Sequence, residues 1–461
     1  MRDTTKPTAW LAPALAYIQT WLAFQMRVSE QVGCALAISH RGRIVLDTAF
    51  GHADLLAGEA LTSQHRFRVA SHSKSFTAAA VMKLREQGKL KLDDPAGKYV
   101  SGLHPAIAAA TISQLLSHTA GIFRDGEDSP YWQGRAPFSD AAKLRRDLKY
   151  PPTIDANTRL KYSNHGFALA GLVIEAVAGE PYASYVAREI VAPAGLSHTT
   201  PDVPLPKGAR LASGHRGKTL LGKRVVFPGD QSTHALTAAT GFVSTAADLC
   251  RFFGQLDPKA KTSVLSPASR REMTRPQWRD AYSAIDTGYG LGIITGAFAG
   301  WDWFGHSGGF QGYLTRTSVV PAHGLTVSLL TNAADGVPAL WSDGVLHILS
   351  TFQKNGAPDP RTRDWSGRWW SLWGATDLVP MGDKVLCAMP GLATPFLKVT
   401  ELAVTAKDEA RIAQAGAFGN YGEPARLVRA KGGKPREVRL ASGRLVPEAA
   451  LRKELLARYG R

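Results

Sequence analysis

Two predicted β-hairpins lie far apart in the chain and frame a long stretch of different character. The first joins the apolar runs 34–39 and 44–50 through His40-Arg41-Gly42-Arg43. The second joins the runs 310–320 and 325–332 through Pro321-Ala322-His323-Gly324. Between them, from about residue 96 to 240, helix-spaced apolar residues alternate with loops rich in Gly and Pro. The pattern predicts an α/β fold in the broad, α+β sense: one antiparallel sheet built from both ends of this region, flanked by helices, with an all-helical insertion at about 96–240.

Further elements follow from local periodicity. An amphipathic helix is expected over about residues 9–31, because Leu11, Leu15, Ile18 and Leu22 recur at helical spacing. Other helices are predicted at 111–118, 141–148, 166–178 and 246–256, and further strands at 240–245, 289–295 and 301–305.

The stretch from Phe67 to Ala78 runs from a short apolar strand into a helix that is expected to reach about Gln87. Ser71 stands at the predicted helix start, where a hydroxyl residue is a preferred cap. Lys74 follows three residues later, so both side chains emerge on one face of the first turn. A serine becomes a nucleophile when a base removes its proton, and a buried lysine with a lowered pKa is such a base.

A second polar group, Lys161-Tyr162-Ser163-Asn164, precedes the helix predicted at 166. A tyrosine hydroxyl can relay a proton if nearby ammonium charge lowers its pKa. An asparagine amide can hold a substrate carbonyl and fix a lysine at the same time. Tyr162 and Asn164 are therefore candidate site residues.

The third group is Gly305-His306-Ser307-Gly308-Gly309, at the start of a late strand. Gly309 has no side chain, so its backbone N–H can approach a substrate oxygen closely. His306 is expected to orient either the Tyr162–Lys74 pair or the substrate.

Together the three groups, in this order, resemble the motifs of β-lactamase and penicillin-binding-protein serine hydrolases, beginning with Ser-x-x-Lys. Within this family, the chain resembles the class C β-lactamase-like branch, which includes D-aminopeptidases, DD-peptidases and esterases. The sequence segments 115–122, 162–166 and 241–245 also support the resemblance. The resemblance covers roughly residues 30–350.

The resemblance implies a role for each candidate residue. Ser71 would attack a carbonyl and form an acyl-enzyme, while Lys74 and Tyr162 would share the proton transfers. Asn164 would bind the acyl-side amide, and Gly308 would contact the substrate. Backbone N–H groups of Ser71 and Gly309 would form the oxyanion hole. The expected reaction is hydrolysis of an amide or peptide bond, including bonds of D-amino acids, or of an ester.

Two departures from the family pattern concern the substrate. His306 replaces the lysine of the family's Lys-Thr-Gly motif, and Gly309 stands where many β-lactamases carry Ser or Thr. Both changes weaken recognition of a free C-terminal carboxylate. An amide or ester hydrolase of the D-aminopeptidase or esterase kind is therefore favoured over an efficient β-lactamase, with a carboxylesterase, an acyltransferase or a weak β-lactamase as alternatives on the same fold.

Two other readings remain open from sequence. Gly305 to Gly309 also fits Gly-x-Ser-x-Gly, the nucleophile elbow of α/β-hydrolases, with Ser307 as nucleophile and Asp335 or Asp343 and His347 following. That elbow must lead from a strand into a helix. The other alternative is a non-catalytic binding or sensor protein that keeps the fold.

Beyond a Gly/Pro-containing boundary at 355–360, short strand-like runs predict a small β-rich C-terminal domain over 360–461, following a hydrolase domain over 1–355. It contains a cluster of four tryptophans: Trp365, Trp369, Trp370 and Trp373. This cluster is interpreted as a small core seam rather than a carbohydrate platform.

Bulk properties limit the partners. The net charge is +17, yet no block of Lys and Arg and no nucleic-acid-binding motif occurs, so a scattered basic surface and a small-molecule or short-peptide substrate are expected. The dispersed histidines predict no metal, and no cofactor is expected. No apolar run is long enough to span a bilayer. Three widely spaced cysteines and a poor signal-peptide pattern favour the cytoplasm, or the periplasm if the N-terminus is processed.

Overall fold

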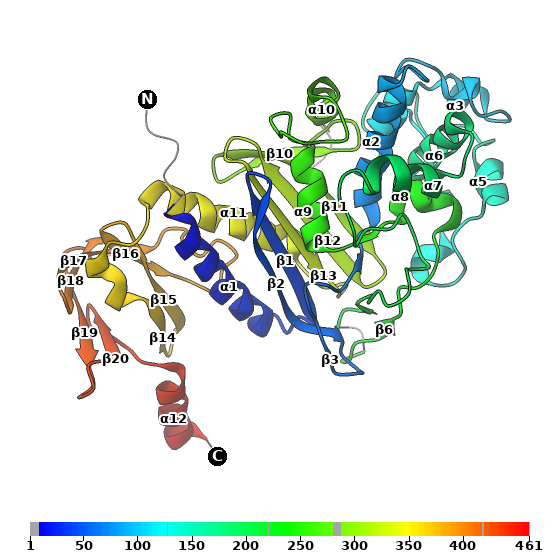
Figure 1. Ribbon diagram of the computed structural model, residues 1–461. Helices are drawn as coiled ribbons and strands as arrows, with labels where there is room; N and C mark the ends of the chain where they lie inside the picture. The colour runs from blue at the N-terminus through cyan, green and yellow to red at the C-terminus, as the bar shows by residue number, and fades with distance from the viewer. Residues whose placement is uncertain (1–8, 127, 220, 280–286, 417–418, 461) are drawn as a thin grey trace. The chain divides into compact units, whose positions relative to one another are not determined.

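The computed structural model describes residues 9–126, 128–219, 221–279, 287–416 and 419–460 (Figure 1). The chain forms two compact units, one of residues 31–342 and one that joins residues up to 30 with residues 343–461. The division into domains 1–355 and 360–461 stays a prediction. The first eight residues, which form part of the N-terminal stretch with the poor signal-peptide pattern, lie outside the described residues.

The unit of residues 31–342 is built around an antiparallel sheet with the strand order β3-β2-β1-β13-β12-β11-β10-β9-β8 among the described residues. The strands are β1 Gly33–His40, β2 Arg43–Asp54, β3 Glu59–Ala60, β8 Trp278–Arg279, β9 Gly288–Tyr289, β10 Ile294–Phe298, β11 Trp301–Phe310, β12 Tyr313–Val320 and β13 Leu325–Thr331. β1 pairs with β13, from Cys34 opposite Thr331 to His40 opposite Leu325. This pairing joins the two hairpins and confirms the predicted sheet.

The helical insertion lies beyond one end of the sheet (Figure 1). Its helices are α3 Pro105–Ala109, α4 Ile112–Leu116, α5 Ala141–Asp147, α6 Asn164–Ala178, α7 Tyr182–Val186 and α8 Thr237–Thr240. Polar caps set their starts: Thr111 forms a capping box at α4, and Ser163 accepts a hydrogen bond from the Gly166 N–H at α6. α9 (Ala246–Gln255) packs on β1 and β13, and α10 is Pro267–Thr274.

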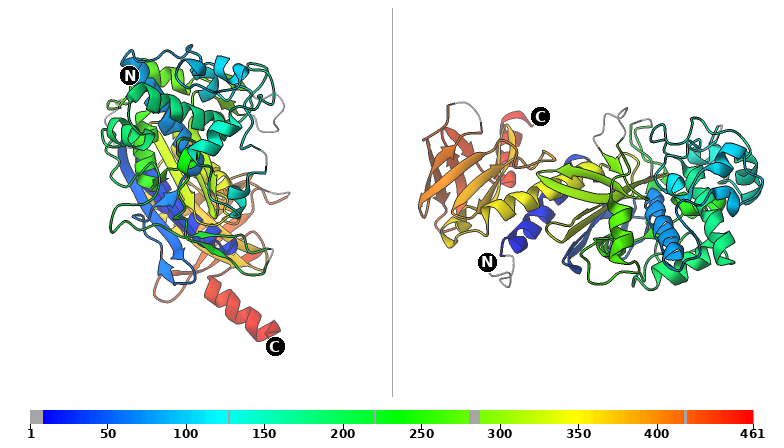
Figure 2. Two further views of the ribbon diagram at one scale, coloured as in Figure 1. Left: turned by 90° about the vertical axis from the view of Figure 1, so that its right-hand side faces the viewer. Right: turned by 90° about the horizontal axis from the view of Figure 1, so that it is seen from above.

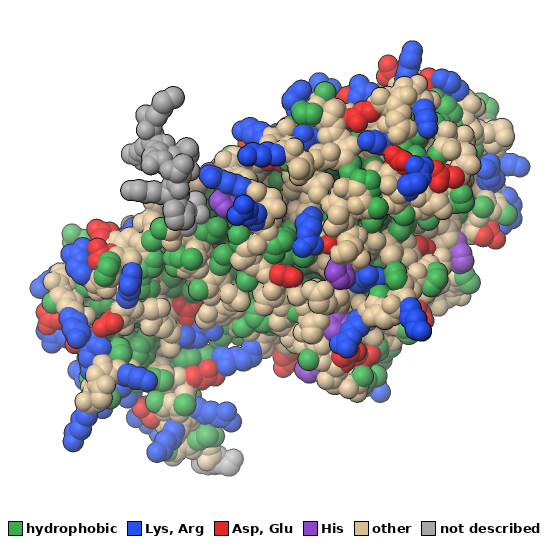
Figure 3. All heavy atoms as spheres, viewed as in Figure 1, with side chains coloured by type: hydrophobic (Ala, Val, Ile, Leu, Met, Phe, Trp, Pro, Cys, Tyr) green, Lys and Arg blue, Asp and Glu red, His purple; other side chains and the backbone are tan. Residues whose placement is uncertain are grey.

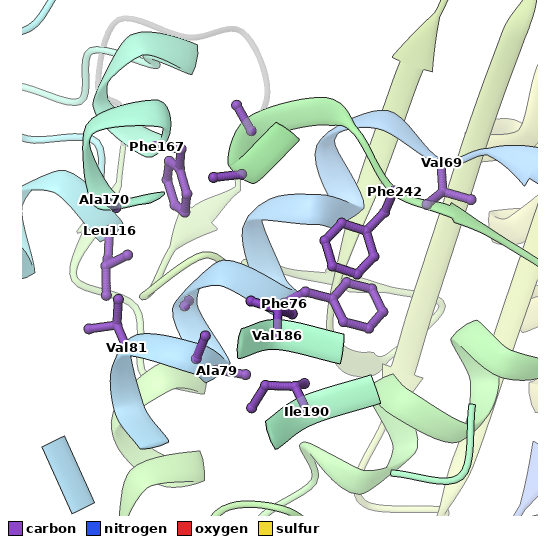
Figure 4. Packing of buried hydrophobic residues seen from close by; sticks show 14 of the residues in the cluster. Val69, Phe76, Ala79, Val81, Leu116, Phe167, Ala170, Val186, Ile190 and Phe242 are labelled. Atoms are coloured by element: carbon purple, nitrogen blue, oxygen red, sulfur yellow. The ribbon is translucent and has the colours of Figure 1, made fainter. Parts of the chain in front are cut away.

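α2 (Ser73–Glu86) connects the sheet to the insertion and is buried over most of its length. The Phe76 ring stacks on that of Phe242, with centroids 4.3 Å apart (Figure 4). It also stacks on the Phe252 ring, with centroids 3.8 Å apart. α2 also carries three consecutive buried alanines, Ala78, Ala79 and Ala80, and it contacts α6 and α8. This packing fixes the first turn of α2 in the core.

Three predicted boundaries were wrong in detail. The return strand expected at 240–245 is short, β7 Val243–Ser244, and it pairs with β4 (Phe67–Arg68). The predicted strands 301–305 and 310–320 have other bounds in the structure. β11 continues to Phe310, and the turn before β12 lies at Gln311-Gly312. α2 is preceded by a 3₁₀ turn, Ala70–His72, so Ser71 lies in that turn rather than capping an α-helix.

The second unit contains α1 (Leu11–Val28) and an antiparallel sheet of eight consecutive strands, β14 to β21, in sequence order. These are β14 Gly367–Ser371, β15 Gly374–Met381, β16 Lys384–Ala388, β17 Thr400–Ala406, β18 Glu409–Gln414, β19 Pro424–Arg429, β20 Pro435–Leu440 and β21 Gly443–Leu445. α11 (Pro338–Asn355) leads into this unit, and α12 (Glu448–Tyr459) ends it. The sheet curls into a nearly closed barrel (Figure 2), because Trp370 and Val446 exchange two backbone hydrogen bonds across its ends.

The tryptophans of the predicted cluster have different environments in this barrel. Trp365 and Trp369 lie in its apolar core, which confirms a core role for these two rings. Trp373, in contrast, is 99% exposed in the β14–β15 turn. The predicted β-rich C-terminal region is thereby confirmed.

Candidate active site

Ser71 lies at the junction between β4 and α2. From residue 65 to residue 82 it is the one residue that is not buried. The preceding Ala70 has a φ of 47°, a strained value for a residue with a side chain. Ser73 holds this turn, since its hydroxyl donates to the Ala70 carbonyl at 2.5 Å and accepts from the Phe242 N–H at 3.0 Å. The Ser71 hydroxyl is thus presented from a rigid support.

Lys74 is fully buried beside it. Its Nζ lies 3.2 Å from Ser71 Oγ, 2.7 Å from Asn164 Oδ1 and 2.8 Å from the Ala239 carbonyl. Burial lowers the pKa of Lys74 well below its usual value, although the charge of Asp125 opposes this effect. A neutral amine has two hydrogens and one lone pair. Because two carbonyl oxygens accept the hydrogens, the lone pair is left for the Ser71 hydroxyl.

Tyr162 approaches Ser71 from the other side. Its phenol is hydrogen-bonded to the Ser71 side chain, and its ring centroid lies 4.8 Å from Lys74 Nζ. Burial raises the pKa of Tyr162 above its usual value, and the Ser71 hydrogen bond and Arg124 only partly oppose this. The condition stated from sequence, that nearby charge lowers this pKa, is not met, because desolvation outweighs the charge of Arg124. The phenol is protonated at neutral pH and acts as a donor.

Asn164 connects Lys74 to a residue that sequence reasoning missed, Asp125. The Asn164 amide accepts from Lys74 through Oδ1 and donates through Nδ2 to Asp125 Oδ1 at 2.6 Å. The same carboxylate oxygen accepts from Trp132 Nε1 at 3.0 Å. Asp125 thus fixes which end of the amide faces the lysine. No sequence signal distinguishes it from an ordinary loop aspartate.

His306 has different partners from those expected. Its Nε2 lies 2.9 Å from the Tyr289 hydroxyl, and its Nδ1 lies 2.7 Å from the Ser307 carbonyl oxygen. Burial lowers the pKa of His306 well below its usual value, so the ring is neutral. Nδ1–H then donates to the carbonyl and Nε2 accepts from Tyr289. Both nitrogens are occupied, which leaves neither to orient Tyr162 or Lys74.

Tyr289 and His118 are further residues that sequence reasoning missed. The His118 ring lies 4.1 Å from the Tyr162 ring and 4.7 Å from the Tyr289 ring, and its Nδ1 accepts from the Ser163 N–H at 3.1 Å. The stretch 115–122 was recognised in the sequence, but the direction of its histidine could not be read from it. His118 holds the Tyr162 ring in place.

Gly308 lets β11 pass unusually close to the Ser71 turn. A Cβ at this position would lie 2.2 Å from the Val69 carbonyl oxygen and 2.6 Å from Thr315 Oγ1. Any side chain here would push the strand away from the turn. The glycine requirement at this predicted site residue is therefore steric.

Gly309 has its backbone N–H on the open edge of β11. The hairpin closed by Phe310 and Tyr313 directs the amides of even-numbered residues toward β12, so that of Gly309 points the other way. On that side β10 pairs with β11 only as far as Gly305, opposite Ile294. Past that point β11 contacts the 3₁₀ turn containing Ser71. The structure therefore brings Ser71, Lys74, Tyr162, Asn164, Gly308 and Gly309 together.

Ser307 does not occupy a nucleophile elbow. It lies within β11, which continues into a tight turn and then β12, with no helix after it. Asp335 is ion-paired with Arg224 at 2.6 Å. The α/β-hydrolase alternative was wrong because the Gly-x-Ser-x-Gly pattern here belongs to a hairpin.

Among the described residues, no group of three or more His, Cys, Asp or Glu side chains is arranged to hold a metal ion. No helix in the described parts of the chain is both long and apolar enough to cross a membrane. On the face shown in Figure 3, Lys and Arg side chains are scattered among neutral ones.

The chain is similar to known proteins over most of its length. The family described as Beta-lactamase has a model that matches residues 24–345. Penicillin-binding protein 4 of Amycolatopsis lactamdurans is 30% identical over 321 residues, which are 65% of this chain and 80% of that protein.

Solved structures share the fold. The octameric penicillin-binding protein homologue from Pyrococcus abyssi aligns with a TM-score of 0.66 at 23% identity, over 94% of this chain and 99% of that one. A D-stereospecific amidohydrolase from Streptomyces sp. aligns with a TM-score of 0.58 at 25% identity, over 69% and 94%. The resemblance inferred from the three motifs is confirmed. The chain belongs to the Beta-lactamase family.

Proposed function

We propose that the protein is a serine hydrolase that cleaves amide bonds through an acyl-enzyme on Ser71. The observation that carries this proposal is the position of the Ser71 hydroxyl between a fully buried amine, 3.2 Å away, and the phenol of the half-buried Tyr162. An ordinary surface serine near a lysine would have neither the lowered lysine pKa nor the second partner.

Acylation would use the two partners in opposite senses. Lys74, in the neutral form that burial favours by lowering its pKa, takes the proton of Ser71 while Oγ attacks the substrate carbonyl carbon. The backbone N–H groups of Ser71 and Gly309 hold the resulting oxyanion, a contribution of about 3–4 kcal/mol per donor in other hydrolases. Tyr162, protonated because its pKa is raised, gives its proton to the leaving nitrogen.

Deacylation would restore each group. The Tyr162 phenolate takes a proton from water, and the hydroxide attacks the acyl carbon. The Lys74 ammonium then returns its proton to Ser71 Oγ as the acyl group leaves. Asn164 keeps the lysine amine oriented throughout, and it contacts the acyl side of the substrate.

An amide substrate, including one built from D-amino acids, is supported by the D-stereospecific amidohydrolase among the similar structures. His306 and Gly309 argue against efficient recognition of a leaving-group carboxylate. Carboxylesterase or acyltransferase activity and weak β-lactamase activity are the alternatives, since each would use the same acyl-enzyme.

The test is a panel of p-nitroanilides, p-nitrophenyl esters, nitrocefin and D-alanyl peptides, run on the wild type, Ser71→Ala and Ser307→Ala. We expect turnover of at least one amide, loss of all turnover in Ser71→Ala and retention in Ser307→Ala. A Ser71→Ala variant as active as the wild type contradicts the proposal. A protein that turns over nothing and gains no covalent adduct supports the non-catalytic alternative.

A further inference from the structure

Arg124 lies beside Tyr162 at the site, one residue before Asp125. Its carbonyl accepts the N–H groups of Asn164 at 2.9 Å and His165 at 3.2 Å, so the start of α6 fixes its backbone. Its side chain is 64% exposed, and its Cζ lies 5.6 Å from the Tyr162 ring centroid. A cation is therefore held beside the phenol that contacts Ser71, open to solvent.

Most of the hydrogen-bonding capacity of Arg124 is unused. Its Nε lies 3.0 Å from Asp125 Oδ2, and its two terminal nitrogens have no partner among the described residues. A guanidinium presents its donors as a planar fork that matches a carboxylate. The free edge of Arg124 is thus suited to an anionic group of a substrate.

The neighbouring charges favour an anion over a cation. The Asp125 carboxylate, 12% exposed, already accepts from Asn164, Trp132 and Arg124. Burial is the main reason why the pKa of His118 is lowered, and the charges of Arg124 and Lys161 lower it further, so Lys161 adds a second positive charge near the site. A substrate ammonium would meet these cations while the nearby carboxylate is occupied.

The distances limit the length of the substrate. The path from Ser71 Oγ through the Tyr162 hydroxyl and ring to Arg124 Cζ is at most about 11 Å long. This length assumes an ordinary O–H···O distance between Ser71 and Tyr162. Consider an acyl group with four bonds between its carbonyl carbon and the carbon of a terminal carboxylate. When that carboxylate pairs with the Arg124 guanidinium, the distance from Ser71 Oγ to Arg124 Cζ is roughly 10 Å. Because Arg124 is on the side of Asn164, the anionic group belongs to the acyl part.

We propose that Arg124 makes the site selective for acyl groups that carry a carboxylate, an inference that rests on the serine-hydrolase function proposed above. The inference is compatible with weak recognition of a C-terminal carboxylate, which would lie on the leaving-group side near Gly309. It sets the substrate of this protein apart from an amino acid amide with a free ammonium group.

Three p-nitroanilides test it: glutaryl, with a carboxylate; glutaramyl, its neutral isostere; and 5-aminopentanoyl, with an ammonium. We expect kcat/KM for glutaryl to exceed that for glutaramyl by about tenfold, as for one partly exposed charge-assisted pair. The 5-aminopentanoyl compound should be slowest. In Arg124→Gln the glutaryl-to-glutaramyl ratio should fall to about one, and in Arg124→Lys it should be partly kept.

Arg135→Gln is the matched control. Arg135 is an exposed arginine of the same loop, ion-paired with Asp128, so its loss removes the same charge but should keep the ratio. If the anilides are not turned over, fluorophosphonates with carboxylate or carboxamide tails give the same comparison from their rates of Ser71 labelling.

Equal rates for the two tails, a preference for the ammonium compound, or an unchanged ratio in Arg124→Gln would overturn the inference while leaving the hydrolase intact. Failure of every probe to label Ser71 would remove the proposed function, and the inference with it.

Discussion

Replacing Gly308 by alanine should damage the proposed oxyanion hole while leaving the side chains of Ser71, Lys74 and Tyr162 unchanged. The new methyl group would lie 2.2 Å from the Val69 carbonyl oxygen and 3.0 Å from its carbon. Ordinary contact needs more than 3 Å, so β11 must retreat from the Ser71 turn by about 1 Å. The Gly309 amide moves with it. A misplacement of that size lowers a rate by about 10²-fold.

The assay is the single-turnover rate of Ser71 acylation by a p-nitrophenyl ester, together with the free energy of unfolding in urea. We expect about 100-fold slower acylation and a loss of about 1–3 kcal/mol from overpacking. Gly309→Ala is the comparison, since its methyl meets Leu314 Cδ2 at 3.4 Å, an ordinary contact, and the N–H is kept. Its acylation should slow by less than tenfold. A Gly308→Ala protein that is folded and acylated at the wild-type rate refutes the reasoning.

Three other predictions follow from the contacts of the site and the core. Lys74→Met should slow acylation by about 10²–10⁴-fold while Ser71 stays in place, because the base is lost; a folded variant with the wild-type rate contradicts this. Because Lys74 is a base only when it is neutral, kcat/KM should rise with pH through the pKa of Lys74. Asp125→Asn removes a charge that raises this pKa, so the rising part of the pH profile should move to lower pH. Asp128→Asn changes an exposed carboxylate and should leave the profile unchanged. Phe76→Ala should lower the free energy of unfolding by about 3–5 kcal/mol in urea titration, while Leu56→Ala, 80% exposed, should change it by less than about 0.5 kcal/mol.

The sequence carried much of the fold because its patterns are local. The two hairpin turns and the helices expected at 111–118 and 166–178 are readable from neighbouring residues. The order of Ser71, Tyr162 and His306 was sufficient to indicate the family. The exact strand ends were not readable, since β11 and β7 are bounded by tertiary pairing rather than by their own residues.

The missed features of the site depend on burial and on partners distant in sequence. The raised pKa of Tyr162 results from desolvation, which no local pattern reveals. His306 reaches Tyr289 instead of Tyr162 because the strand directs its ring toward β9. Asp125 acts through an amide from another element, 39 residues away. Gly308 and Gly309 look alike in the sequence. Only the structure shows that Gly308 leaves no space for a side chain, because the Val69 carbonyl lies against it.

The central claim is that Ser71, Lys74, Tyr162 and the Gly309 amide meet around one oxygen. The most direct measurement is a crystal structure of the protein after reaction with a fluorophosphonate. We expect phosphorus bonded to Ser71 Oγ, with one phosphoryl oxygen about 2.7–3.1 Å from the backbone nitrogens of both Ser71 and Gly309. An adduct on another residue, or a phosphoryl oxygen directed away from the Gly309 amide, contradicts the account.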